Sequence, residues 1–286
     1  MSKQSNQLSQ DDIKFVDELA YKAGQMAVSM REGVGVHTKS GPSDLVTDAD
    51  LKISRVIIEA LSARFPQDLI VSEEDKHENT EEELTQHSRV WLIDPIDGTD
   101  NYVKQDGQYS TMIGLLVDGH PYYGWIYQPS TKTMFYGGPT YGAFKRVDGQ
   151  NAVRYAEQAP LSEERAVRIM MGWGDRRRHP WVMNLPNVEF VHSHSLGLKI
   201  IKVLEDEADV FISLTGRVKL WDTAAPAAIA LGNNLDAGTV DGAPLPYPVP
   251  RIQHGSSVII GRKGTIAWAG RHIEGHTTRS VPKTFR

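Results

Sequence analysis

Two aspartates that flank a proline mark the place where this sequence could most readily do chemistry. The run VWLIDPIDGT leads a hydrophobic stretch into Asp94 and Asp97. Pro95 fixes its own φ angle and disfavours a helical Asp94, so the strand should stop with both carboxylates in one turn. Gly98 and Thr99 then offer backbone N–H groups where a helix could begin, and such a terminus attracts phosphate. The segment therefore predicts a site for a divalent metal and a phosphate group.

Two further acids, Glu73 and Asp222, occupy comparable positions. Glu73 closes the strand-like run LIVSEED, and Asp222 follows Trp221 where a helix is expected to open. Taken alone, Asp222 would be explained by an N-cap role. Together, the four carboxylates are the hard oxygen ligands that Mg²⁺ prefers. Two such ions could generate a hydroxide and stabilise the leaving oxygen of a phosphate ester, so hydrolysis would need no protein nucleophile.

Several other chemistries are excluded by what the sequence lacks. It contains no cysteine, which removes thiolate nucleophiles, disulfides and zinc–thiolate sites. Neither a G-x-S-x-G elbow nor a G-x-x-x-x-G-K-[ST] phosphate loop occurs. The net charge of −5 argues against nucleic-acid or membrane-surface binding, which use a basic excess. With a polar first segment and no long apolar stretch, we expect a soluble, cytoplasmic protein that acts on a small-molecule phosphate ester.

The basic residues leave two alternatives open. His192 and His194 fall on a strand-like run, where a structural pair is the simpler interpretation and a functional pair on one face is the alternative. Arg176, Arg177 and Arg178 form a triplet. A solvated turn would explain the triplet, whereas its functional interpretation is a clamp on a substrate phosphate.

The N-terminal half predicts two amphipathic helices followed by strands. Apolar residues recur at spacings of three, four and seven over residues 13–30, with a comparable apolar face over 53–65. Between them, the glycine-rich segment 33–44 predicts a mobile loop of the kind that acts as a lid. Residues 111–146 contain strand-length apolar runs broken by turn signals, which predicts antiparallel strands. The charged segment 76–88 is expected to be a solvated insertion.

The second half alternates between strand-like and helical patterns, which indicates layered α and β structure. Strand-like runs begin at Val167, Val188, Asp209 and Val258, and helical patterns begin at Leu198 and Thr223. A chain of 286 residues with 40% hydrophobic content predicts one compact unit with two lobes. We place a soft boundary near residue 150. The lobe of residues 1–150 would carry most of the acids, and the lobe of residues 151–286 would add Asp222.

Four motifs, in order, resemble the inositol monophosphatase superfamily of Mg²⁺-dependent, lithium-sensitive phosphatases. They are KSGPSDLVTDAD (Lys39–Asp50), similar to the lid-loop segment of that family; VSEED (Val71–Asp75), similar to its G-E-E strand end; DPIDGT (Asp94–Thr99), its metal motif; and WDTAA (Trp221–Ala225), its W-D-x-A motif. The resemblance implies an α+β fold, a layered αβαβα sandwich of the inositol monophosphatase/fructose-1,6-bisphosphatase type. It also implies a homodimer.

The resemblance further implies a role for individual residues. Glu73, Asp94 and the Ile96 carbonyl would bind one Mg²⁺, and Asp94, Asp97 and Asp222 a second, with two or three ions in the site. Glu73 and Thr99 would hold the attacking water, with help from Asp50. The amides of Gly98 and Thr99 would contact the phosphate.

The substrate follows from where the chain departs from the inositol-specific pattern. Pro226 stands in place of a glycine, and Thr215 in place of an acid that contacts inositol hydroxyls. The segment from Gly197 instead resembles 3′(2′),5′-bisphosphate nucleotidases, which implies that Lys199 and the arginines Arg176, Arg177 and Arg178 hold the second phosphate or the adenylate. We expect 3′-phosphoadenosine 5′-phosphate as substrate. The alternatives are an inositol or sugar monophosphatase and, more distantly, a non-catalytic regulator of the same fold.

Overall fold

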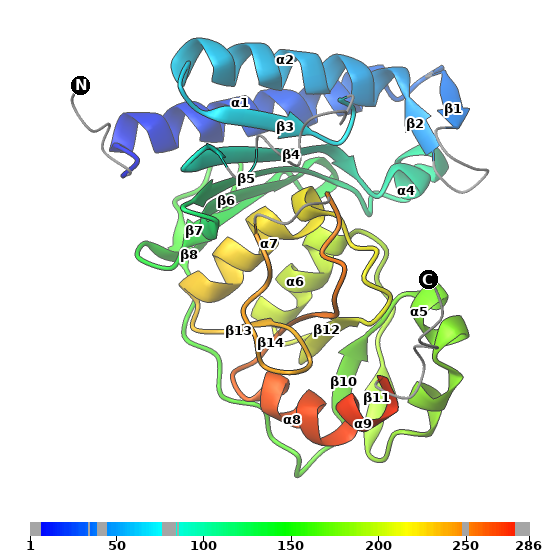
Figure 1. Cartoon of the computed structure of the whole chain (residues 1–286). Helices are drawn as coiled ribbons and strands as arrows, with labels where there is room; N and C mark the ends of the chain where they lie inside the picture. Colours follow the sequence, from blue (N-terminus) through cyan, green and yellow to red (C-terminus); the bar gives the residue numbers. More distant parts are fainter. Residues whose placement is uncertain are drawn as a thin grey trace, which may run out of the picture.

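The chain folds into five alternating layers of helices and sheets (Figure 1). The computed structural model describes residues 7–33, 35–38, 45–75, 84, 86–247 and 252–277. From one side to the other, the layers are helices α1 (Gln10–Met30) and α2 (Asp48–Arg64), a first sheet, helices α6 (Leu196–Leu204) and α7 (Leu220–Gly232), a second sheet, and helices α8 (Thr265–His272) and α9 (Glu274–Thr277). The predicted αβαβα sandwich is confirmed.

Helices α1 and α2 each begin at a capping box. Ser9 accepts a hydrogen bond from the Asp12 N–H, and Asp12 accepts one from the Ser9 N–H, at the start of α1. Thr47 and Asp50 form the same reciprocal pair at the start of α2. These pairs satisfy N–H groups that a helix start otherwise leaves without partners. The helices predicted over 13–30 and 53–65 are thus confirmed, although both start earlier than their apolar periodicity indicates.

The first sheet has the strand order β3-β4-β5-β6-β7-β8-β9. Only β3 and β4 pair in parallel; the following pairs are antiparallel. This confirms the antiparallel strands predicted over 111–146. The strands are β3 (Leu69–Ser72), β4 (Arg89–Asp97), β5 (Ser110–Val117), β6 (His120–Gln128), β7 (Thr133–Gly138), β8 (Gly142–Val147) and β9 (Val153–Arg154).

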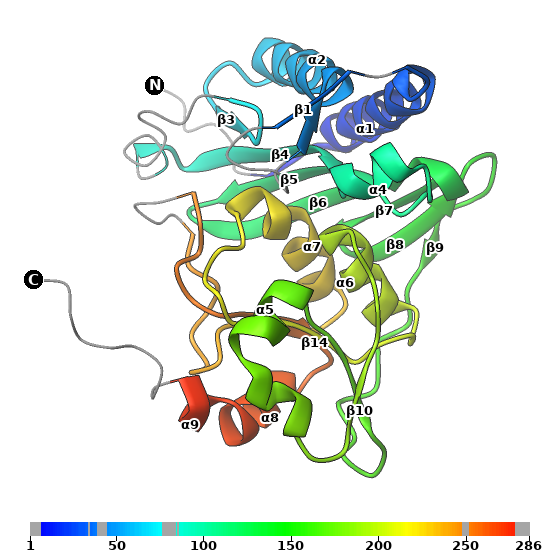
Figure 2. The ribbon, with the colours of Figure 1, turned by 90° about the vertical axis from the view of Figure 1, so that its right-hand side faces the viewer.

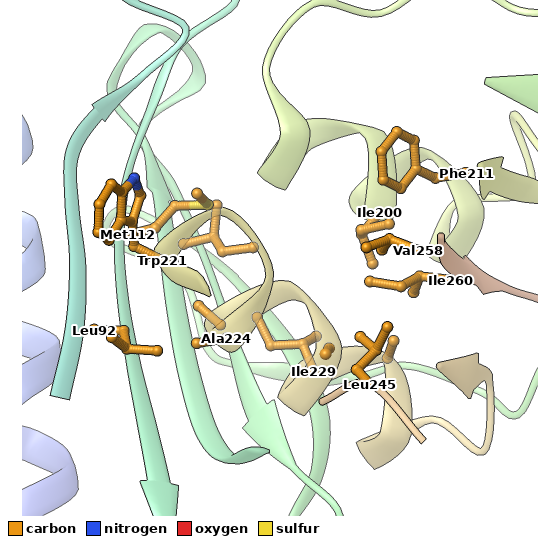
Figure 3. Packing of buried hydrophobic residues seen from close by; sticks show 14 of the residues in the cluster. Leu92, Met112, Ile200, Phe211, Trp221, Ala224, Ile229, Leu245, Val258 and Ile260 are labelled. Carbon is orange, nitrogen blue, oxygen red and sulfur yellow. The ribbon is translucent and has the colours of Figure 1, made fainter. Parts of the chain in front are cut away.

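Helix α7 packs almost directly on the backbone of the first sheet. A Cβ on Gly114 of β5 would lie 2.6 Å from Ala224 Cβ, and one on Gly124 of β6 would lie 2.4 Å from the Ala225 carbonyl oxygen. Small residues on both surfaces therefore allow the close approach. On the side away from the first sheet, Ile229 of α7 lies near Leu245 and near Ile260 of the second sheet (Figure 3).

The second sheet has the strand order β11-β10-β12-β14-β13, in which β10 pairs in parallel with both its neighbours. Its strands are β10 (Val167–Met170), β11 (Val188–Phe190), β12 (Val210–Ser213), β13 (Asp236–Gly238) and β14 (Val258–Gly261). Two predictions need correction. The strand that begins at Val188 ends at Phe190, so His192 and His194 lie beyond it. The helix expected from Thr223 already begins at Leu220.

The remaining described elements are short. Part of the predicted 33–44 loop is a strand, because β1 (Val36–Thr38) pairs with β2 (Leu45–Thr47). The rest of that loop, 39–44, and most of the insertion at 76–88 lie outside the described residues. Helices α4 (Thr99–Lys104) and α5 (Trp173–Arg178) and the 3₁₀ turns η1 (Pro129–Thr131) and η2 (Pro180–Asn184) complete the fold. In the described part of the chain, no helix has the length and apolar character needed to cross a membrane.

Candidate metal and phosphate site

The predicted acids meet in one hollow of about 320 Å³. Its walls come from the end of β3, the turn that joins β4 to α4, and the first turn of α7. Since β3 and β4 are parallel neighbours, their carboxyl ends bring Glu73 and Asp94 to the same edge of the sheet. The lining residues are Leu45, Glu73, Asp94, Ile96, Asp97, Gly98, Thr99, Asp100, Asn101, His194 and Asp222. We call this space the acid hollow.

The Asp94 carboxylate is buried, and one of its oxygens has no hydrogen-bond partner. The residue is 3% exposed, and its Oδ1 atom is buried without a hydrogen-bond partner. Burial raises the pKa of Asp94 well above its usual value, and the charges of Glu73, Asp97 and Asp222 raise it further. A buried anionic oxygen without a partner is costly, so this atom is suited to a cation.

Asp222 caps helix α7 and also borders the acid hollow. Its Oδ2 accepts a hydrogen bond of 2.8 Å from the Lys219 N–H, which closes the first turn of α7. The residue also lines the acid hollow. Burial, followed by the charge of Glu73, raises the pKa of Asp222 to about 8. The helix cap and the proposed metal ligation are therefore compatible, because a carboxylate has two oxygens.

Asp97 connects β4 to the start of α6. Its Oδ1 accepts a hydrogen bond of 2.9 Å from the Leu196 N–H, and its Oδ2 accepts one of 2.8 Å from the Gly197 N–H. The hydroxyl groups of Ser195 and Ser110 also donate to Oδ2. These contacts hold the carboxylate in one orientation beside the acid hollow.

Gly197 makes this close approach possible. A Cβ there would lie 2.6 Å from Met112 Sδ and 3.2 Å from Asp97 Oδ2, and Met112 is fully buried. Although alanine normally favours a helix, we expect Gly197→Ala to destabilise the fold by about 1–3 kcal/mol through overpacking. Because α6 must shift from Asp97, kcat should also fall. Chemical denaturation and steady-state kinetics would check both effects.

Gly275→Ala on α9 is the matched control, since a Cβ at that position meets nothing within 4 Å. Equal stability of the two alanine variants would contradict the assigned packing of α6 on Asp97.

The strand predicted to stop at Asp94 instead continues to Asp97, because both aspartates still pair with β5 across a register shift at Pro95 and Ile96. The end of β4 and the turn into α4 supply the remaining groups of the predicted site. Gly98 has a φ angle of 92°, a left-handed conformation that glycine adopts without strain. The Thr99 hydroxyl donates a hydrogen bond of 3.1 Å to the Ile96 carbonyl oxygen, and all three residues line the acid hollow. Asp50 is buried in the capping box of α2 and is not part of the hollow lining, but its charge contributes to the raised pKa of Asp94.

The donor set suits a hard divalent cation. Carboxylate oxygens and the Ile96 carbonyl are the ligands that Mg²⁺ takes, and the partnerless Asp94 oxygen lies among them. Within the described ranges, however, no three acidic or histidine side chains are already arranged around a single point as a metal cage. The oxygens of Asp97 are directed at α6, and one oxygen of Asp222 caps α7. The oxygen donors are therefore of the kind that Mg²⁺ binds, and binding of the ion would require some of these side chains to reorient.

Comparison with known proteins identifies the family. The sequence model of the inositol monophosphatase family matches residues 9–265. The chain belongs to that family. It is therefore a phosphatase, as the four motifs indicated.

Individual relatives agree with this membership. A 3′(2′),5′-bisphosphate nucleotidase CysQ from Aggregatibacter actinomycetemcomitans is 35% identical over 217 residues, which cover 74% of this chain and 78% of that protein. An inositol-1-monophosphatase from Bacillus subtilis is 27% identical over 246 residues, which cover 81% and 88%. The structure of staphylococcal IMPase-I complexed with products shares the fold, with a TM-score of 0.77 and 22% identity over 95% of this chain and 98% of that one.

The basic residues predicted to contact substrate lie outside the lining of the acid hollow. Lys199 of α6 is 9% exposed; its ammonium group donates a hydrogen bond of 3.0 Å to the His194 carbonyl and lies over the Phe211 ring. The arginine triplet is helical, on α5, rather than a turn. Arg176 lies over the ring of Phe190 and Arg177 over that of Trp173, and Arg177 and Arg178 are exposed.

Two residues of this region were missed from the sequence. His194 lines the acid hollow, although a structural pair with His192 was the simpler interpretation. Buried Asp175 of α5 accepts hydrogen bonds from the N–H groups of Leu214 and Thr215, at 2.8 and 3.0 Å. Asp175 thereby fixes the backbone that follows β12. His194 could have been noticed in the sequence by its position just before Ser195, the N-cap of α6.

Proposed function

We propose that this chain is a Mg²⁺-dependent phosphomonoesterase that hydrolyses 3′-phosphoadenosine 5′-phosphate to AMP and phosphate. The observation that carries the metal dependence is the buried, partnerless Oδ1 of Asp94 within a hollow whose lining includes all four predicted carboxylates, those of Glu73, Asp94, Asp97 and Asp222. Four such groups repel one another and need positive charge to stay ionised together. A non-catalytic regulator of the same fold would have no use for this repulsion.

The proposed residue roles are those that the family resemblance implies. Glu73, Asp94 and the Ile96 carbonyl would hold one Mg²⁺, and Asp94, Asp97 and Asp222 a second, with two or three ions in all. Bound Mg²⁺ would supply Lewis acidity and lower the pKa of a coordinated water. Glu73 and the Thr99 hydroxyl would orient the attacking water, and Asp50 would support them from α2. The Gly98 and Thr99 amides would hold the scissile phosphate.

The choice of a bisphosphate nucleotide rests on two observations. A relative at 35% identity carries the name 3′(2′),5′-bisphosphate nucleotidase. In addition, Thr215 provides no carboxylate where inositol-specific members are expected to have one, and Asp175 binds its N–H group. We also propose two functional lobes that divide near residue 150, a homodimer, lithium sensitivity and a cytoplasmic location.

A parallel assay would test the substrate. Phosphate release should be measured with Mg²⁺ for 3′-phosphoadenosine 5′-phosphate and for myo-inositol 1-phosphate at equal concentrations. We expect kcat/KM to be at least about tenfold higher for the nucleotide, a difference equivalent to roughly 1.4 kcal/mol. A preference for the inositol ester would overturn the nucleotidase assignment. Absence of phosphate release from either ester would favour the non-catalytic alternative.

A further inference from the structure

The acid hollow is lined by one basic side chain, that of His194, in the described part of the chain. The other titratable lining residues are acidic: Glu73, Asp94, Asp97, Asp100 and Asp222. His194 is an exposed residue, so a ligand can reach it from solvent. It comes from the segment before α6, whereas most of the acids come from β3, β4 and the turn into α4. The histidine therefore borders the hollow from a different structural element.

Hydrogen bonds hold the backbone at His194 and at the residue that follows it. Its carbonyl oxygen accepts a hydrogen bond of 3.0 Å from the buried ammonium group of Lys199. The next residue, Ser195, donates to Asp97 and caps α6 by accepting a hydrogen bond from the Leu198 N–H. Helices α6 and α7 lie side by side beneath the first sheet, which gives this segment a rigid base (Figure 2). Such support fixes a side chain at a binding site.

Charge balance indicates what His194 would recognise. The lining carboxylates and the scissile phosphate would neutralise the positive charge of the metal ions. A second phosphate on the same ester would carry further negative charge into a hollow whose own side chains are otherwise acidic, and it would need a cationic hydrogen-bond donor. The His194 ring supplies an N–H donor, and the Lys199 ammonium group behind the His194 backbone supplies positive charge.

We propose that His194 is a specificity-determining residue that binds the second, non-scissile phosphate of a bisphosphate ester. This inference rests on the proposed nucleotidase function and refines it. In this account Lys199 is a positioning residue, because its ammonium group is directed at the His194 carbonyl.

The test compares two substrates that differ only in the second phosphate: adenosine 3′,5′-bisphosphate and adenosine 3′-monophosphate. We expect His194→Ala to raise KM for the bisphosphate by about tenfold and to leave KM for the monophosphate within about twofold, since only one of them carries the group that is bound. His194→Arg retains an N–H donor at this position and should keep most of the preference for the bisphosphate. Circular dichroism would confirm that the variants are folded.

His192→Ala is the matched control, because His192 is an exposed histidine two residues away that does not line the acid hollow. It should leave both KM values unchanged. If His194→Ala changes both substrates by the same factor, or neither, the inference is overturned while the nucleotidase function stands. If the wild-type enzyme does not distinguish the two nucleotides, both the second-phosphate inference and the nucleotidase assignment fail.

Discussion

Replacement of Asp94 by asparagine should lower kcat/KM by about a thousandfold, because several kcal/mol of transition-state stabilisation are lost with metal binding. The same change should leave the free energy of unfolding of the metal-free protein unchanged or raise it. One oxygen of the Asp94 side chain has no partner, and burial, followed by the charges of four neighbouring carboxylates, raises the pKa of Asp94. Asparagine keeps the shape of the side chain and removes a repelled negative charge.

Two measurements would check this result: phosphate release in saturating Mg²⁺, and chemical denaturation in the presence of a chelator. Asp11→Asn is a suitable control, since Asp11 is exposed in the first turn of α1, outside the lining of the acid hollow. If Asp94→Asn retains wild-type activity, the assigned site is wrong. A large loss of stability without metal would show instead that the Asp94 charge supports the fold.

The second large effect concerns the pH dependence of the metal-free protein. The folded state raises the pKa of Asp222 from 3.8 to about 8 and so binds the proton more tightly than the unfolded chain does. The resulting stabilisation is complete below about pH 4 and is lost as the pH rises to about 8. With a chelator present, wild-type stability should therefore fall relative to Asp222→Asn across this range. Because part of Asp222 remains exposed to solvent, we expect the two free energies of unfolding to differ by a few kcal/mol, which is less than the full pKa shift would give.

The asparagine variant is a close match for this comparison, since its side-chain oxygen can still accept the hydrogen bond from the Lys219 N–H. Added Mg²⁺ should restore wild-type stability at pH 8, because the ion binds the ionised form. If the stability curves of the two proteins run parallel between pH 4 and 8, the pKa of Asp222 is not raised in the folded state.

The acid hollow was predictable because local chemistry places its acids at element ends. Pro95 does not end the strand, because β4 continues to Asp97 with a register shift between the two aspartates, and Gly98 then leads into α4. The parallel pairing of β3 with β4 brings Glu73 to the same edge. Period-two and helical patterns likewise predicted the antiparallel strands and the first two helices. Convergence of Asp222 with these acids could not be read from periodicity, because it depends on α7 packing on the glycines of β5 and β6.

The basic residues were harder to place. The alternating run VEFVHS is typical of a strand, but its parallel partner β10 ends at Met170 and the chain turns away to start α6. This turn exposes His194 at the acid hollow. Lys199 is buried on α6 beside buried Ile200 and Ile201 and does not line the acid hollow, so its contact with the substrate stays a prediction. Which face of a short helix is covered is a tertiary property that its sequence does not specify.

The central claim, that the acid hollow holds divalent cations, is tested most directly by locating the ions. Crystals grown with Mn²⁺ in place of Mg²⁺ would reveal the metal by its anomalous scattering. We predict an anomalous peak within coordination distance of Asp94 Oδ1 and of Glu73 or Asp222, and this peak should disappear in Asp94→Asn crystals. Manganese bound elsewhere, or none in the hollow at a concentration that supports full activity, would contradict it.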